Sequence, residues 1–317
     1  MSMTTRNMEV LIRSELWSNQ LKEALKDDLM ATRYVDWLSG FPDGSTFTIP
    51  SIGDATVRNY AEDTAIVYDA LDTGEFQFTI STYLSSGNYI TEKARQDAFY
   101  AARLEASFVP KQRRAIMEKL ETDVLALGAG GASGGQTASS TNQINGADHR
   151  WVASGTNEVI AVQDFAKALY SLKKANVPDR NLISIVDPSV EYTLNTITNI
   201  TNVSNNPRWE GIITSGIASG MRFVKNVYGF DVYTSNYLAD ANETISAKTT
   251  AAGKANLFFS ADMSVLPFVG AWRQLPKVDG EYNKDFQREE YVTTCRYGLK
   301  VYRPENLVVV LSDTDQV

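Results

Sequence analysis

KQRRAIMEKLETDVLALG, residues 111–128, carries the plainest structural signal in this chain. Its apolar side chains recur every three or four residues and form one stripe: Ile116, Leu120, Val124 and Leu127. This period is that of an amphipathic helix. Pro110 suits the first helical position, and Gly128 suits the residue just past the end. The stretch therefore predicts a helix that buries its stripe against another part of the chain.

Two further helical regions are predicted on the N-terminal side of this helix. Thr91 is placed to cap a helical segment that Pro110 should end or kink near Phe108. Residues 5–38 carry Leu and Trp at mostly helical spacing, which predicts a helical arm, and the turn residues 41–44 should end it.

Between the arm and Thr91 the hydrophobic period changes to two. TFTIP (46–50) and EFQFTIS (75–81) alternate apolar and polar side chains, so they predict the strands of a long, hairpin-like ribbon. A two-stranded ribbon alone is marginal in water. Phe76, Phe78 and Ile80 share one face, and burying each contributes roughly 1.5–3 kcal/mol. That face must lie either on this chain's own core or on another molecule.

The C-terminal side of the chain reads as a second folded region. The low-complexity stretch GAGGASGGQTASSTNQINGADHRWVASG (128–155) predicts a flexible surface segment. Apolar spacing over residues 162–172 predicts a helix, and LISIV (182–186) predicts a buried strand. Strand-like runs at 290–302 and 307–311 follow near the C-terminus. Alternating helices and strands indicate an α/β or α+β domain.

The composition excludes several classes of protein. The 317 residues include 38 acidic and 30 basic ones, a net charge of −8, so the chain lacks the overall positive charge needed to coat nucleic acid or an anionic membrane. No run approaches the roughly 18 apolar residues of a membrane span, and no secretory signal is visible. We expect a soluble protein made in a reducing cytoplasm.

Residues that could carry chemistry are scarce. Cys295 and His149 are the single cysteine and histidine, so they supply neither an internal disulfide nor a four-ligand zinc site. His149 lies in the low-complexity stretch, which is a poor place for a catalytic base, and it is interpreted as a solvated loop histidine. GGASGGQT (130–137) has the spacing of a phosphate-binding loop, but Gln136 replaces the lysine and the stretch follows a helix. We predict no catalytic, metal or cofactor site, and no enzyme.

The order of these elements resembles the major capsid proteins of tailed bacteriophages, which have the Hong Kong 97-like fold. Residues 111–128 resemble the spine helix of that fold. FAKALYSLKKANVPDRNLISIVDPSVEYTL (165–194) resembles a helix–strand–helix unit of its axial domain. GIASGMRFVKNVYGFDVYTSNYLAD (216–240) resembles a glycine-rich passage that leads into a strand. YGLKVYRPENLVVVLSD (297–313) resembles the closing strands, so the likeness spans nearly the whole chain.

This resemblance implies an α+β fold made of five parts. They are an N-terminal arm (1–43), an extended β-hairpin loop (44–90), a peripheral domain with the spine helix and a Gly-rich break (91–150), an axial α/β domain (151–279) and return strands of the peripheral domain (280–317). The closing strands would then pack beside the spine helix.

The same resemblance implies a function in the virion. Pentamers and hexamers of the chain would form an icosahedral capsid shell around double-stranded DNA, without sequence-specific binding and without a membrane. The chain would be synthesised and assembled in the host cytoplasm. The region before the loop is too short for a built-in scaffolding domain, so we expect a separate scaffolding protein, a portal and a possible decoration protein as partners.

Two groups of side chains are the candidate inter-subunit contacts: Phe76, Phe78 and Ile80 of the ribbon, and Lys111, Arg113 and Arg114 of the helix. The three cations crowd the first turn of the predicted helix, where the helix dipole disfavours positive charge by about 0.3–1 kcal/mol each. We expect them to pair with acids of a neighbouring subunit or to face packaged DNA. A solvated helix face is the alternative.

Other functions stay open at this point. An encapsulin-like compartment has the same fold but encloses enzymes rather than DNA. Another virion part, such as a tail or decoration protein, would not close into spheres. A hydrolase or nucleotide-binding enzyme is disfavoured by the single histidine and by the missing phosphate-loop lysine.

Overall fold

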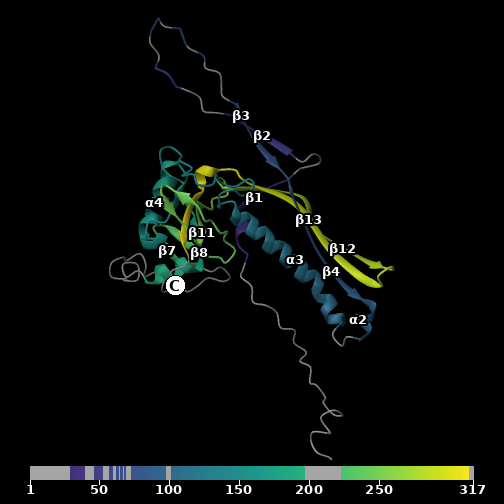
Figure 1. Cartoon of the computed structure of the whole chain (residues 1–317). Coiled ribbons are helices and arrows are strands. Elements are labelled where there is room, and N and C mark those ends of the chain that lie inside the picture. Colours follow the sequence, from purple (N-terminus) through teal and green to yellow (C-terminus); the bar gives the residue numbers. More distant parts are fainter. Residues whose placement is uncertain are drawn as a thin grey trace, which may run out of the picture.

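The chain forms a compact domain, a long arm and a ribbon, which extend in different directions (Figure 1). The structure is a computed structural model, and it describes residues 29–39, 46–52, 57–59, 62–63, 65–66, 68, 73–97, 101–196 and 223–313. Two of the predicted features lie largely or wholly outside the described residues. These are the helical arm over 5–38, except for its last ten residues, and the turn at 41–44.

The compact domain is built on a six-stranded sheet in the order β5-β14-β11-β6-β8-β7. Its strands are β5 (Arg150–Val152), β14 (Val308–Asp313), β11 (Gly253–Ser260), β6 (Leu182–Val186), β8 (Phe230–Thr234) and β7 (Phe223–Val227). The pairs β14–β5 and β6–β8 are parallel, and the remaining pairs are antiparallel. Every residue of β6 is buried, which confirms the buried strand predicted at 182–186.

Both faces of this sheet are covered. On one face, the helices α4 (Val162–Lys174) and α5 (Pro188–Thr196) enclose an apolar cluster in which Phe258 contacts Phe165 edge-on at 5.1 Å between ring centroids. On the other face, Leu257 and Phe259 pack with the C-terminal end of helix α3 (Ala101–Ala126). The end of α3 therefore joins the arm to the core of the compact domain.

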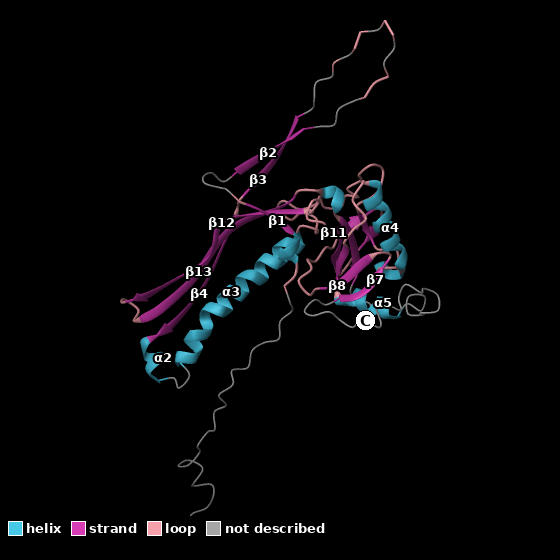
Figure 2. Cartoon of the chain, turned by 180° about the vertical axis from the view of Figure 1, so that it is seen from behind, coloured by secondary structure: helices cyan, strands magenta, loops and turns pink. Residues whose placement is uncertain are grey.

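The long arm is a four-stranded sheet in the order β1-β12-β13-β4 with α3 lying along it (Figure 2). Its strands are β1 (Val35–Leu38), β12 (Phe268–Asn283), β13 (Arg288–Val301) and β4 (Thr82–Thr91), and the short helix α2 (Glu92–Asp97) follows β4. The stripe residues Ile116 and Leu120 pack on Cys295 and Tyr297 of β13, so the predicted amphipathic helix is confirmed. Alternate residues of β13 point away from α3, and Val292 among them is exposed.

The predicted helix end near Phe108 is wrong, because Pro110 lies inside helix α3. Helix contacts hold both sides of the proline against β13. Phe108 lies 6.3 Å from the Tyr291 ring, and Gln112 Nε2 donates to the Tyr291 carbonyl at 2.9 Å. These contacts offset the roughly 3 kcal/mol that an interior proline costs. Helix α2 ends at Asp97, and helix α3 begins at Ala101.

The predicted helical arm is also wrong over its last residues. Ala31–Tyr34 form a short 3-10 helix, and Val35–Leu38 form β1, which pairs in parallel with β12. Trp37 stacks on Trp272 at 5.1 Å and lies over Gly270, where an added Cβ would meet the indole at 2.7 Å. This tertiary pairing overrides the helical spacing, which comes from residues closer to the N-terminus.

The ribbon consists of β2 (Thr46–Ile52) and β3 (Thr73–Thr79), paired antiparallel with Phe47 opposite Phe78 and Pro50 opposite Glu75. Both strands were predicted. The ribbon projects from the junction of the arm and the compact domain (Figures 1 and 2). β3 is followed after two residues by β4, so the chain passes directly from the ribbon into the arm sheet.

The closing strands are where the sequence predicted them, but only the first returns beside α3. β13 lies in the arm, whereas β14 lies in the compact domain between β5 and β11. β12 also begins in the arm at Phe268, before the change of domain expected after residue 279. The remaining short elements are Thr156–Glu158, Thr244–Ile245, Lys248–Thr249 and Pro304–Asn306.

Candidate assembly surfaces

The root of the ribbon is fixed on this chain's own arm. Phe78 and Ile80 are buried and pack with Val269 and Ala271 of β12. Gly298 of β13 lies so close to the ribbon that an added Cβ would meet the Thr79 carbonyl oxygen at 2.7 Å. Of the two surfaces considered for this face, Phe78 and Ile80 therefore lie on the chain's own core.

Phe76 marks the point where the ribbon leaves that support. It is half-buried, contacts Tyr302 edge-on at 5.0 Å, and has Lys300 Nζ 4.6 Å from its ring centroid. Lys300 also donates to the Gln77 carbonyl at 2.7 Å. Farther out, Glu75 is exposed.

The far end of the ribbon presents apolar side chains to solvent. Val57, Ile66 and Tyr68 are 94%, 66% and 89% exposed. The acids Glu62 and Asp63 next to them are exposed as well. Because these large apolar side chains lie on a projecting element, this end of the ribbon is a candidate interaction surface.

The three candidate cations of the helix are not in a first turn, because α3 begins ten residues earlier, at Ala101. The dipole argument therefore does not apply to them. Lys111 and Arg113 are exposed, while Arg114 is half-buried and donates to Glu118 at 2.9 Å. The hydrogen bond to Glu118 raises the pKa of Arg114.

The end of the arm is lined with exposed aromatic rings. Arg288 lies over the rings of Tyr89 and Phe286, at 4.5 Å and 4.7 Å from their centroids. Both rings are more than half exposed. Cation–π contacts of this kind hold the arginine in place and leave the outer ring faces open to a partner.

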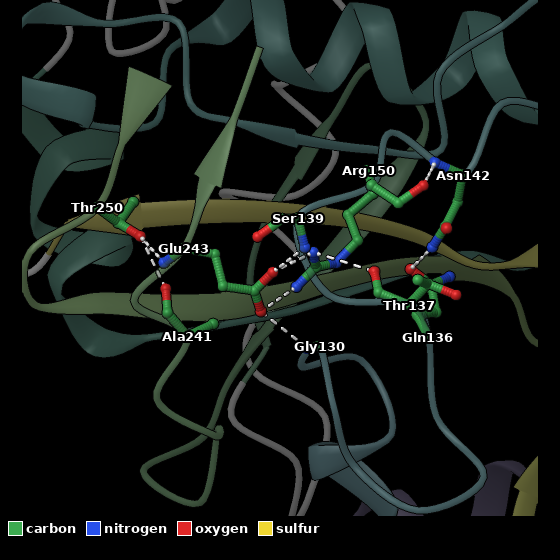
Figure 3. Close-up of polar contacts among 10 residues, drawn as sticks. Gly130, Gln136, Thr137, Ser139, Asn142, Arg150, Ala241, Glu243 and Thr250 are labelled. Atoms are coloured by element: carbon green, nitrogen blue, oxygen red, sulfur yellow. Dashed lines mark hydrogen bonds and ion pairs between the residues drawn. The ribbon is translucent and has the colours of Figure 1, made fainter. Parts of the chain in front are cut away.

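The Gly-rich segment is folded, so the prediction of a flexible surface segment over 128–155 is wrong (Figure 3). It wraps around the carboxylate of Glu243, which accepts hydrogen bonds from the backbone N–H groups of Gly130 at 3.0 Å and Ser139 at 2.7 Å. The fully buried Arg150 donates two more bonds to Glu243, each of 2.6 Å. The hydrogen bonds from Arg150 hold the pKa of Glu243 below its ordinary value.

The polar groups of this segment that resemble a phosphate-binding loop are bonded within the protein. The backbone N–H of Gly130, which a phosphate would need, is bonded to the protein's own carboxylate. The Gln136 amide is buried, where it donates to the Leu307 carbonyl at 3.3 Å and accepts from Asn142 at 3.0 Å. This glutamine holds the segment against the compact domain.

His149 is not a solvated loop histidine, as the sequence suggested, because it is completely buried. Its Nδ1 lies 3.1 Å from the Ala147 carbonyl oxygen. Burial lowers the pKa of the ring. The reason for the wrong prediction is that the Gly-rich segment folds back on β14, where Val309 donates to the His149 carbonyl at 2.9 Å.

The sequence analysis did not identify two acidic residues that hold distant segments in place through hydrogen bonds. Glu243 is one, and its partner Arg150 is 93 residues away along the chain. The other is Glu121 of α3, a buried carboxylate that accepts hydrogen bonds from the backbone N–H groups of Met30 at 2.9 Å and Ala31 at 2.8 Å. It fixes the start of the described chain on α3. The only sequence signal for Glu121 was an acid interrupting an otherwise apolar helix face.

A recess of about 530 Å³ lies where α3, the ribbon root and the Gly-rich segment meet. Tyr297 donates to Asp123 there at 2.6 Å, and burial raises the pKa of this tyrosine. Lys119 also donates to Asp123, so these polar groups satisfy one another.

Among the described residues no group of His, Cys, Asp and Glu is arranged to hold a metal, and no helix is long and apolar enough to cross a membrane.

A family model described as phage capsid protein matches residues 73–310. No curated protein matches the chain.

Solved structures with a similar fold include a protein from Mycobacterium phage Che8, with a TM-score of 0.67 and 17% identity over 93% of this chain and 96% of the other. The capsid of the cyanophage P-SCSP1u gives a TM-score of 0.70 and 16% identity, over 97% of this chain and 94% of the other. The mature capsid of bacteriophage PhiM1 gives a TM-score of 0.67 and 12% identity, over 96% of this chain and 93% of the other. At these identities the likeness shows a shared mixed α/β fold.

Proposed function

This chain belongs to the phage capsid protein family, and from that premise we propose how it builds a shell. It is a structural component of the virion capsid and not an enzyme, as the sequence predicted. We propose that its copies assemble as pentamers and hexamers into an icosahedral shell, and that this shell encloses the double-stranded DNA of a tailed phage. Synthesis and assembly then take place in the host cytoplasm.

In this proposal each part of the fold has a role in the shell. The compact domain is the axial domain, the long arm with α3 is the peripheral domain with its spine helix, and the ribbon is the extended loop. Residues 1–43 are the N-terminal arm, whose last part is held on α3 by Glu121.

The observation that carries the proposal is the ribbon. Its two strands leave the chain's own core at Phe76, and the far end exposes Val57, Ile66 and Tyr68. A two-stranded ribbon has little stability in water, so it needs a further surface. A neighbouring copy of the chain supplies that surface in a closed shell. Lys111, Arg113 and Arg114 of α3 are proposed inter-subunit contacts in the same shell.

Three other partners belong to this proposal. A separate scaffolding protein guides assembly. A portal occupies one vertex, and a decoration protein is a possible addition to the outer surface. The DNA is enclosed without sequence-specific contacts, and the net charge of −8 disfavours non-specific binding of phosphates over the whole surface.

The test is electron microscopy and sedimentation of the expressed full chain, with and without the scaffolding protein of its phage. Closed spherical particles are expected. A chain that stays monomeric under every condition would contradict the proposal. Particles recovered from infected cells should contain DNA, whereas an enzyme cargo would assign the chain to an encapsulin-like compartment.

A further inference from the structure

His149 is a buried histidine that the proposed shell function does not use. Its side chain is fully buried, and its Nδ1 lies 3.1 Å from the Ala147 carbonyl oxygen. Its Nε2 is buried too, yet it has no hydrogen-bond partner among the residues that the structure describes. A buried polar atom without a partner is uncommon in folded proteins, and it often stores strain or serves a function.

This histidine lies in the Gly-rich segment, which joins helix α3 of the arm to strand β5 of the compact domain. The segment is bonded to both parts. The Gly134 carbonyl accepts a hydrogen bond from Val301 at the end of β13, and the His149 carbonyl accepts one from Val309 of β14. Release of this segment would therefore loosen the joint between the arm and the compact domain.

The backbone of the segment is held in conformations that it would rarely adopt alone. Ser139, Asn142 and Asn145 have positive φ angles of 51°, 42° and 49°. Residues other than glycine rarely take this left-handed conformation, and they keep it only where surrounding contacts hold them. The contacts of His149 are among these, because its backbone N–H donates to the Thr141 carbonyl at 3.0 Å.

The charged groups around the ring give a proton on it little support. The acids that attract the charged ring are Glu305, in the turn between β13 and β14, and Asp148, in the segment itself. Glu305 is exposed to solvent, which screens its charge. Asp148 is already paired with Lys167 of α4 at 3.2 Å. Strand β14 contributes valines at 308–310, which carry no charge.

Burial is the largest influence on the ring, and it lowers the pKa of His149 from its ordinary value of 6.5. The ring is therefore neutral in the folded segment. Because the Ala147 carbonyl oxygen can only accept, Nδ1 carries the proton and Nε2 carries the free lone pair. A proton on Nε2 would add a second buried positive charge next in the sequence to Arg150, which is fully buried and already paired with Glu243 (Figure 3).

We propose that His149 is an acid-sensitive switch: protonation of its Nε2 releases the Gly-rich segment and loosens the joint between the arm and the compact domain. The switch needs no second copy of the chain, since every group in it belongs to one chain. The open segment binds the proton more readily than the closed one. The stability of the closed segment is therefore complete above pH 6.5 and falls as the pH drops below that value. The stabilisation by Glu243 is lost only below pH 4.5, so the two effects are separable.

Hydrogen exchange of the full chain, measured by mass spectrometry at pH 7.5 and pH 5.5, tests this switch. The exchange rates are corrected for the intrinsic effect of pH on amide exchange. Between these values the single histidine of the sequence titrates, whereas carboxyls with ordinary pKa values stay ionised. The amides of residues 139–150 should lose protection by about threefold or more at pH 5.5, and those of β6 and β11 should not change.

Two variants remove the titrating group in different ways. His149→Asn keeps a donor for the Ala147 carbonyl but cannot be protonated, and His149→Phe keeps a buried ring without a titrating group. Both should abolish the difference between the two pH values. Glu305→Gln is the matched control, because it removes an acid that acts on the ring and leaves the histidine in place. The control should keep the difference.

Equal protection of residues 139–150 at both pH values in the wild type overturns the inference, as does a difference that persists in a folded His149 variant. A loss of protection that extends over β6 and β11 also overturns it, because the whole domain would then be opening. Where neither variant folds, an NMR titration of the single histidine in the wild type decides. A ring pKa at or above 6.5 overturns the inference, and a clearly lower pKa supports it.

Discussion

β11 of the compact domain and β13 of the long arm are both long inner strands, yet their two faces are covered differently. All residues of β11 except Lys254 are buried, because helices or other segments pack on each side of it. In β13 the residues toward α3 include the buried Thr293, Cys295 and Tyr297, whereas Val292 on the other face is exposed. The compact domain completes its core within one chain. The arm and the ribbon leave apolar side chains exposed, and in the proposed shell other copies cover them.

The largest expected effect comes from removing a ring from the complete core. Phe258→Ala empties the site where Phe165 and Phe230 both contact this ring edge-on, at 5.1 Å and 5.4 Å. It should lower the free energy of unfolding by about 3–5 kcal/mol. Phe286→Ala at the arm end is the matched control and should change it by less than about 0.5 kcal/mol, because Phe286 is 65% exposed. Urea unfolding measures the free energy of unfolding of both variants. Equal losses of stability would contradict the difference in packing between the compact domain and the arm.

A somewhat smaller loss is expected from Glu243→Ala, which leaves the guanidinium of the fully buried Arg150 without its carboxylate. The expected cost is about 3 kcal/mol, since breaking a buried pair strands a charge. Asp179→Ala is the control, because its pair with Lys173 is exposed and contributes at most about 1 kcal/mol. Chemical denaturation of both variants checks this. A loss no larger than that of the control would mean that water reaches Arg150.

The same carboxylate should make stability depend on pH. The folded-state pKa of Glu243 is lowered from its ordinary value of 4.5, chiefly by the hydrogen bonds from Arg150. The stabilisation is therefore fully present above pH 4.5 and is lost as the pH falls through the lowered pKa. Glu243→Gln should flatten this acid limb of the stability curve, as thermal melting from pH 7 downward would detect. An unchanged acid limb would assign the dependence to other carboxyls.

The smallest effect on stability is expected at the ribbon end, where the effect on assembly is expected to be large. Tyr68 is 89% exposed, so Tyr68→Ala should leave the melting temperature unchanged. Particle yield should fall, because the ring is available only to another copy. Tyr170→Ala on the exposed surface of α4 is the control. A drop in melting temperature for Tyr68→Ala alone would place that ring in this chain's own core.

Local patterns predicted most of the regular elements. The stripe of α3, the buried strand β6, the alternating strands of the ribbon and the closing strands all follow from spacing over a few residues. The errors have a common cause. Pro110 stays helical, residues 35–38 form a strand and the Gly-rich segment is folded, because each is held by residues far away in the sequence. The candidate contacts differ for the same reason. Phe78 and Ile80 pack on β12 of the same chain, whereas Lys111 and Arg113 are exposed and form no ion pair with any residue that the structure describes.

The sequence by itself indicated the class of protein, since the order of its helices, strands and Gly-rich break resembles one capsid family, and the family model that matches residues 73–310 confirms it. Only the tertiary structure decided which apolar faces are already used. Hydrophobic periodicity states that a face must be buried but does not name what buries it. That partner is fixed by the packing of distant segments, as for Phe78 on Val269. The Gly-rich segment likewise folds around Glu243, a residue far away in the sequence.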